Sequence, residues 1–213
     1  MSSEDVSISD VQMSTAKSRP YTMTRRAEQV DRTRLRITEA AVRLHTTVGP
    51  ANTSVASVAE EAGVTRVTVY RHFATLDDLF AACTAHWRAG HPAPDAMAWL
   101  SIADQEDRAR VAFGELYAWY RANADDLFPI NRDRAALPRT ATQAVDDRTA
   151  VLADAILGGE APAGPPGRQV QAVARHLVEF TTWHALAIRQ GLAQGDDVEV
   201  AVRILLAVAA RTP

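Results

Sequence analysis

The segment SVASVAEEAGVTRVTVYRHF, residues 54–73, constrains the fold more than any other part of this 213-residue sequence. In its first half, apolar residues recur at intervals of three and four, which places them on one face of a helix. These residues are Val55, Val58, Ala59 and Ala62. Gly63 follows, and glycine readily adopts the left-handed conformation that ends a helix. The segment is therefore predicted to form two short helices joined by a tight turn.

The second of these helices has a polar surface. Thr65 is a suitable N-cap for it, and Val69 and Phe73 can face inward. Its other side chains are rich in hydrogen-bond donors: Arg66, Thr68, Tyr70, Arg71 and His72. This arrangement is typical of a helix-turn-helix whose second helix contacts DNA. An ordinary helical hairpin would show much of the same pattern, so the flanking sequence has to decide between them.

The flanks supply two more helices. An apolar stripe of Ile37, Ala40, Ala41, Leu44 and Val48 begins near Asp31 and stops at Gly49 and Pro50. Downstream, Thr75 and Asp78 have the spacing of a capping box at the start of a fourth helix. Helices are therefore expected at about 31–48, 54–62, 65–72 and 76–90.

From about Arg32 to Leu79 the chain resembles the N-terminal domain of the TetR family of bacterial regulators. The resemblance is carried by Ala40, Ala41, Gly49, Thr53, Ser54, Val58, Ala59, the run from Ala62 to Thr65, Thr68, Tyr70, Phe73 and Leu79. Three residues depart from the family pattern: His45 replaces an apolar aromatic, Val67 a small residue, and Leu76 a lysine that reaches a phosphate. The resemblance implies a DNA-binding domain, a dimer, and a C-terminal domain that binds a small effector.

Composition agrees with an all-α protein. The chain is 47% hydrophobic, its glycines and prolines are sparse within the apolar-periodic segments, and strand-like alternation is absent. Cys83 is the only cysteine, so no intramolecular disulfide or thiolate cluster can form, and a reducing cytoplasm is expected. No apolar run approaches the roughly 18–20 residues that span a bilayer, so no membrane partner is expected.

Charge is distributed unevenly along the chain. Residues 25–88 carry nine arginines against seven acidic residues, a net +2, whereas residues 89–213 carry twelve against sixteen, a net −4. Positive charge thus coincides with the segment expected to contact DNA. Residues 1–24 are interpreted as a disordered arm, residues 25–80 as the helix-turn-helix domain, and residues 81–213 as a helical domain for effector binding and dimerisation.

The second domain is expected to contain helices at about 105–123, 139–157, 168–190 and 197–210. It also contains most of the large aromatic residues, which can form either a solid core or the wall of an apolar cavity. The resemblance favours the cavity. The predicted wall consists of Trp99, Phe113, Tyr117, Tyr120 and Trp183, and the expected effector is a hydrophobic small molecule. Trp119 lies off the Tyr117–Tyr120 face and is the weakest candidate.

The last two helices carry apolar stripes that predict the dimer interface. Its expected residues are Val170, Val173, Ala174, Leu177, Thr181, Val198, Val202, Leu205 and Leu206. Two such helices from each chain can form a four-helix interface, and the resemblance implies the same arrangement.

No catalytic constellation is recognisable. His176 and His184 are eight residues apart, about 12 Å along a helix, which is too far for one metal ion without further ligands. The adjacent acidic pairs do not face each other on a helix and are poor acid–base couples. No enzyme activity, metal or cofactor is therefore expected.

The sequence predicts a transcriptional regulator, most simply a ligand-responsive repressor that binds a near-palindromic DNA operator as a homodimer. The predicted DNA-binding residues are Thr53, Ser54, Thr65, Arg66, Thr68, Tyr70, Arg71 and His72. Two alternatives remain open: a regulator without a small-molecule effector, either constitutive or controlled by a protein, and a helical enzyme or carrier.

Overall fold

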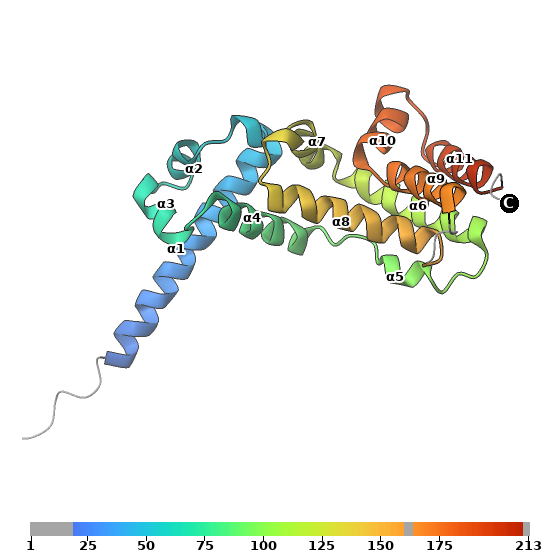
Figure 1. The fold of residues 1–213 in the computed structure, drawn as a ribbon. Helices are drawn as coiled ribbons and strands as arrows, with labels where there is room; N and C mark the ends of the chain where they lie inside the picture. The colour runs from blue at the N-terminus through green and yellow to red at the C-terminus, as the bar shows by residue number, and fades with distance from the viewer. Residues whose placement is uncertain (1–18, 160–163, 211–213) are drawn as a thin grey trace, which may run out of the picture. The chain divides into compact units, whose positions relative to one another are not determined.

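The computed structural model describes residues 19–159 and 164–210. All the regular elements within these ranges are helical (Figure 1), which confirms the predicted fold class. By contacts the chain divides into residues 1–36 and residues 37–213. The first unit contributes the N-terminal part of α1, which runs over Arg19–Thr47.

Helix α1 begins twelve residues earlier than expected from the sequence. The predicted disordered arm covers residues 1–24, and its last six residues, 19–24, are helical in the structure. Residues 1–18 of the arm lie outside the described ranges. Pro20 suits a first helical turn, because the missing amide hydrogen is not needed there. No glycine or proline then follows until Gly49, so nothing in the sequence ends the helix. The stripe that begins near Asp31 marks only where the helix gains an apolar face.

The helix-turn-helix is formed by α2 (Val55–Glu61) and α3 (Arg66–His72), preceded by the short 3₁₀ helix η1 (Pro50–Asn52). Gly63 adopts a φ of 63°, and the amides of Gly63 and Val64 donate to the carbonyls of Glu60 and Ala59. This Schellman arrangement ends α2 as the sequence predicted. The expected capping box is present at the start of α4 (Leu76–Gly90), between Thr75 and Asp78.

One buried cluster holds these helices together. It joins the C-terminal part of α1, the helix-turn-helix and α4 through Ile37, Ala40, Ala41, Val58, Ala59, Ala62, Val69, Phe73, Leu79 and Cys83. Cys83 is buried, and burial raises the pKa of its thiol to about 12. Interlocking alanines allow the helix backbones to approach closely, so α3 is fixed by its inner face and its outer face is left to solvent.

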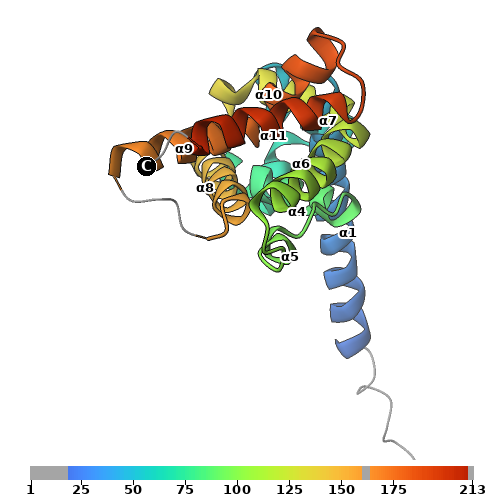
Figure 2. The ribbon, with the colours of Figure 1, turned by 90° about the vertical axis from the view of Figure 1, so that its right-hand side faces the viewer.

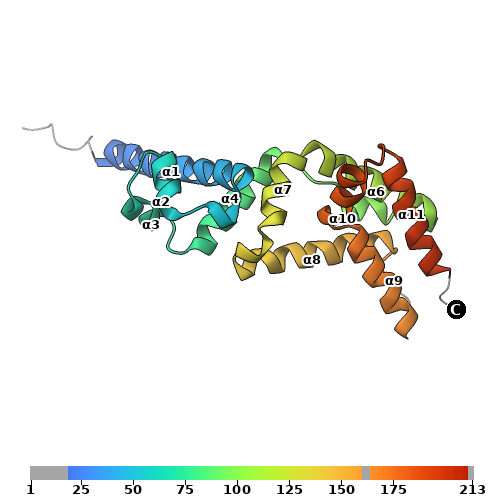
Figure 3. The same cartoon turned by 90° about the horizontal axis from the view of Figure 1, so that it is seen from above.

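The rest of the chain folds around a second cluster. The short helix α5 (Ala96–Trp99) is followed by α6 (Gln105–Ala122), α7 (Ala124–Arg132), the 3₁₀ turn η2 (Arg134–Ala136) and α8 (Arg139–Ile156). Helix α8 contacts both α4 and α9 (Gly164–Leu177), and α9 is inclined to α8 (Figure 3). Helix α11 (Asp196–Ala209) packs against α6 and α9 (Figure 2).

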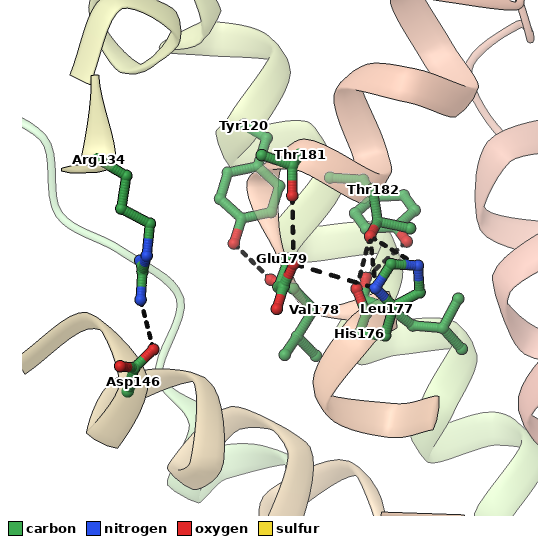
Figure 4. A network of polar contacts seen from close by, with 10 residues as sticks. Tyr120, Arg134, Asp146, His176, Leu177, Val178, Glu179, Thr181 and Thr182 are labelled. Atoms are coloured by element: carbon green, nitrogen blue, oxygen red, sulfur yellow. Dashed lines mark hydrogen bonds and ion pairs between the residues drawn. The ribbon is translucent and has the colours of Figure 1, made fainter. Parts of the chain in front are cut away.

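The helix expected at 168–190 is broken. Helix α9 ends at Leu177, Glu179 is extended, and the chain resumes as α10 (Phe180–His184) and the π-helical turn η3 (Ala185–Arg189). The Tyr117 hydroxyl donates to the Leu177 carbonyl at 2.8 Å, and the Tyr120 hydroxyl donates to the Val178 carbonyl at 2.6 Å (Figure 4). These bonds satisfy carbonyls at the break, where the regular helical ladder is interrupted.

Candidate functional site

Helix α3 presents a continuous exposed face. Val69 and Phe73 are each 2% exposed and anchor its inner side, whereas Val67 is 76% exposed and Tyr70 is 54% exposed. Arg66 and Arg71 are also exposed. Because an anchored helix with protruding side chains can enter the major groove as a rigid unit, this geometry suits DNA recognition.

The predicted polar residues around α3 divide into two groups. Ser54 and Thr65 are helix N-caps: the Ser54 hydroxyl accepts from the Ser57 amide, and the Thr65 hydroxyl accepts from the Thr68 amide. Thr53 donates to the Gly49 carbonyl at 2.9 Å. These hydroxyls fix the helix starts, and a cap of this kind contributes about 1 kcal/mol. The side chains projecting beyond them belong to Arg66, Tyr70 and Arg71, with Thr68 and His72 half-buried at the flanks.

Val67 is a surface residue that the sequence analysis treated only as a departure from a pattern. In the structure it is the most exposed large apolar side chain of the α3 surface. An exposed valine on a recognition helix can contact a thymine methyl group, the one apolar feature of the major groove. Its position, two residues before buried Val69, was the available signal.

Residues 37–83 match the family model described as bacterial regulatory proteins of the tetR family, and this segment contains the helix-turn-helix and its core. This segment belongs to the TetR family. It is the DNA-binding domain of a transcriptional regulator. No curated protein matches the chain in sequence.

Several solved structures resemble this fold over 82–84% of the chain. A Streptomyces coelicolor regulator has a TM-score of 0.53 at 18% identity, over 84% of this chain and 80% of that one. A TetR-like regulator from Rhodococcus sp. RHA1 has a TM-score of 0.55 at 17% identity, over 84% and 97%. The multidrug binding protein EbrR, solved with imidazole, has a TM-score of 0.53 at 26% identity, over 82% and 88%.

A cavity of about 580 Å³ lies among α1, α4, α6, α7 and α8. Five aromatic side chains line it: Phe80, Trp87, Trp119, Tyr120 and Phe180. A volume of this size is in the range of small-molecule sites, and aromatic walls suit a flat apolar ligand.

Of the five residues predicted to form the ligand wall, four do not line this cavity. Trp99, Phe113, Tyr117 and Trp183 are at most 1% exposed and belong to the second core cluster; only Tyr120 reaches the cavity. Trp99 donates to Glu115, and the hydroxyls of Tyr117 and Tyr120 are bonded to the α9–α10 break rather than free for a ligand. Trp119, the weakest candidate from sequence, lines the cavity. A second hollow of about 330 Å³ beside Tyr117 is small and opens near Asp197.

Five of the nine residues predicted for the dimer interface are buried within a single chain. These residues, Val170, Ala174, Leu177, Val202 and Leu205, are at most 2% exposed, because α9 packs against α8 and α11, and α11 packs against α6. Val173, Val198 and Leu206 remain partly exposed, and Thr181 is exposed. The apolar face of α11 therefore belongs mainly to the protomer core.

Two further properties concern membranes and metals. Among the described residues, no helix combines the length and apolar composition required to cross a membrane. His, Cys, Asp and Glu side chains nowhere gather in threes suited to a metal ion within the same ranges.

His45 lines the cavity and lies 5.2 Å from the Phe80 ring, measured between ring centroids. Burial lowers its pKa to about 4 from 6.5. Between these values the unfolded chain binds more protons than the folded one, so stability falls as the pH decreases from above 6.5 towards 4. We expect His45 to lower the free energy of unfolding by about 2 kcal/mol when the pH falls from 7 to 5.

Urea unfolding of the wild type and of His45→Phe at both pH values tests this expectation. The phenylalanine variant should lose less stability on acidification, whatever its stability at pH 7. Equal losses in the two proteins would show that His45 titrates normally when folded.

Proposed function

We propose that the protein is a repressor that holds a near-palindromic operator as a homodimer and releases it when a small molecule occupies the cavity. The observation that carries this proposal is that one segment, residues 130–137, both lines the cavity and contacts the loop that precedes the helix-turn-helix. Ile130, Asn131, Arg134 and Leu137 line the cavity. Between them, Arg132 and Asp133 bind the loop that precedes the helix-turn-helix.

The contacts to this loop are specific. Arg132 Nη2 donates to the Val48 carbonyl at 2.9 Å, and the Ala51 amide donates to Asp133 Oδ2 at 3.1 Å. Gly49 lies between them with a φ of 93°, and a Cβ there would come within 2.2 Å of Asp133 Oδ2. Because the fit is this close, a ligand that displaced the 130–137 segment would also displace the loop and, with it, α2 and α3.

For DNA recognition, we assign base contacts to Arg66, Thr68 and Arg71, with Val67 against a thymine methyl. We assign phosphate contacts to Tyr70 and Thr65. Thr53, Ser54 and His72 would lie beside the same stretch of the DNA backbone. One α3 spans only a few base pairs, so two-fold symmetry is needed to specify a useful site. The outer surfaces of α9 and α11, including Val173, Leu206 and Ile204, are the surfaces from which the dimer would be built.

Support for a ligand comes from the cavity and, by analogy, from EbrR, which is described as a multidrug binding protein. The alternative is a constitutive or protein-controlled regulator with an unoccupied cavity, and an enzyme or carrier is a more distant one. These are distinguished by fluorescence anisotropy with DNA from upstream of the protein's own coding region, with and without compounds that raise its melting temperature. A ligand-controlled repressor should bind this DNA tightly, and a stabilising compound should weaken its affinity for the DNA. Tight DNA binding that no stabilising compound alters would contradict control by a ligand.

Coupling between the cavity and the helix-turn-helix through residues 130–137 can be tested separately with Asp133→Ala. The variant should bind DNA and the compound, yet the compound should change DNA affinity less than threefold where the wild type changes by tenfold or more, because the loop is no longer held. Asp125→Ala, which removes an exposed acid from α7, the helix that ends just before Asp133, is the matched control and should behave as the wild type. An unchanged response in Asp133→Ala would show that coupling takes another route.

A further inference from the structure

The charged side chains lining the cavity are unevenly paired. Its three carboxylates all have partners. Asp77 accepts a hydrogen bond from Thr140. Figure 4 shows the other two, in which Asp146 accepts from Arg134 and Glu179 accepts from Thr181. Arg134 is therefore also paired. The two remaining arginines, Arg88 and Arg148, form no hydrogen bond or ion pair through their side chains within the described residues. The unpaired charge of the cavity is thus positive.

Arg148 is the more unusual of the two. Its Nη2 atom is fully buried without a hydrogen-bond partner, and its guanidinium lies over the Trp119 ring, 5.6 Å from the centroid. A buried guanidinium normally pairs with a carboxylate, because desolvation without a partner is costly. Burial, followed by repulsion from Arg88, lowers the pKa of Arg148, as expected for a cation that lacks its counter-ion.

Trp119 presents a second unsatisfied donor. Its indole Nε1 is also buried and has no partner, although the ring lines the cavity. The indole is an N–H donor only, and so is the guanidinium. Two neighbouring buried donors without an acceptor therefore point to an acceptor group that enters from outside the chain.

We propose that the cavity binds an organic anion, a small molecule whose carboxylate or similar oxyanion pairs with Arg148 and accepts from Trp119, and whose body is apolar and aromatic. The inference deepens the proposed function by stating the chemical class of its ligand. The body would pack against Phe80, Trp87, Tyr120 and Phe180, which form the apolar part of the wall. Neutral His45 adds no competing charge at pH 7.

A matched pair of fluorescent probes tests the anionic requirement without DNA. 1-Anilinonaphthalene-8-sulfonate and N-phenyl-1-naphthylamine share a ring framework, but only the first carries an oxyanion. We expect the wild type to bind the sulfonate at least about tenfold more tightly, as a charged hydrogen bond worth about 1.5–3 kcal/mol implies. Arg148→Met should weaken sulfonate binding about tenfold or more and change binding of the neutral probe less than twofold. Arg148→Lys should recover part of the loss.

Arg175→Met is the control, because it removes the same charge from an exposed position on α9. It should leave both affinities unchanged, which separates a local contact from the general field of the protein. Equal affinities for the two probes, unchanged sulfonate binding in Arg148→Met, or no binding of either probe would each overturn the proposal. DNA affinity, measured separately for Arg148→Met, reports on the regulator function independently of these results.

Discussion

Leu205→Glu should unfold the protein rather than separate a dimer. Leu205 is 0% exposed and lies in the core between α11, α6 and α9. A carboxylate there would be buried without a partner while the leucine packing is lost, which together cost more than about 4 kcal/mol. Circular dichroism should show loss of the cooperative melting transition, or a large decrease of its midpoint.

Ile204→Glu is the matched comparison, one residue earlier on the same helix and 42% exposed in the protomer. It should fold with near wild-type stability. If the outer surface of α11 forms the dimer, light scattering should find monomers that have lost DNA affinity. A Leu205→Glu protein that melts like the wild type would contradict the placement of α11, and a dimeric Ile204→Glu protein would move the interface away from this surface.

Arg66→Ala combined with Tyr70→Ala should abolish specific DNA binding without unfolding the domain. Both side chains project from α3 while Val69 and Phe73 hold it from within. A lost base-reading arginine costs about 1–3 kcal/mol, and a lost phosphate contact adds to this, so affinity should fall about thirtyfold or more. Fluorescence anisotropy at fixed salt measures the change, since phosphate contacts make all such affinities salt-dependent.

Arg189→Ala serves as the charge control for this pair, because Arg189 is exposed at the end of η3, remote in sequence from the helix-turn-helix. Its affinity should equal that of the wild type. Wild-type affinity in the Arg66, Tyr70 double variant would remove α3 from the DNA contact.

The helix-turn-helix was predictable because its determinants are local. Gly63 ends α2, Thr65 and Thr75 cap the next two helices, and the inward face of α3 follows from the spacing of Val69 and Phe73. Each of these signals acts within about four residues of its own position. The observed bounds of α2, α3 and α4 consequently agree with the expected ones to within a residue or so.

The α9–α10 break was not predictable because it depends on distant residues. The bonds from Tyr117 and Tyr120 span about sixty positions in sequence, and no glycine or proline marks the point where the helix ends. Periodicity alone continues through Val178 and predicts one long helix.

The residues that line the cavity were not predictable for a related reason. Aromatic content shows that a domain contains large rings but not which rings face a hollow. Trp99 and Trp183 are core residues, whereas Trp119 and Arg148 face the cavity because of how α6 and α8 are turned towards α4. The apolar stripes of α9 and α11 were ambiguous in the same way, since a stripe predicts burial without naming the partner.

The most direct test of the account is selection of binding sites from a random DNA pool by the wild type and, in parallel, by the Arg66→Ala, Tyr70→Ala variant. The account predicts that the wild type enriches a near-palindrome whose half-sites are about one helical turn or slightly more apart, and that the variant enriches nothing. Enrichment of the same palindrome by both proteins, or of an asymmetric single half-site by the wild type, would contradict recognition by paired α3 helices.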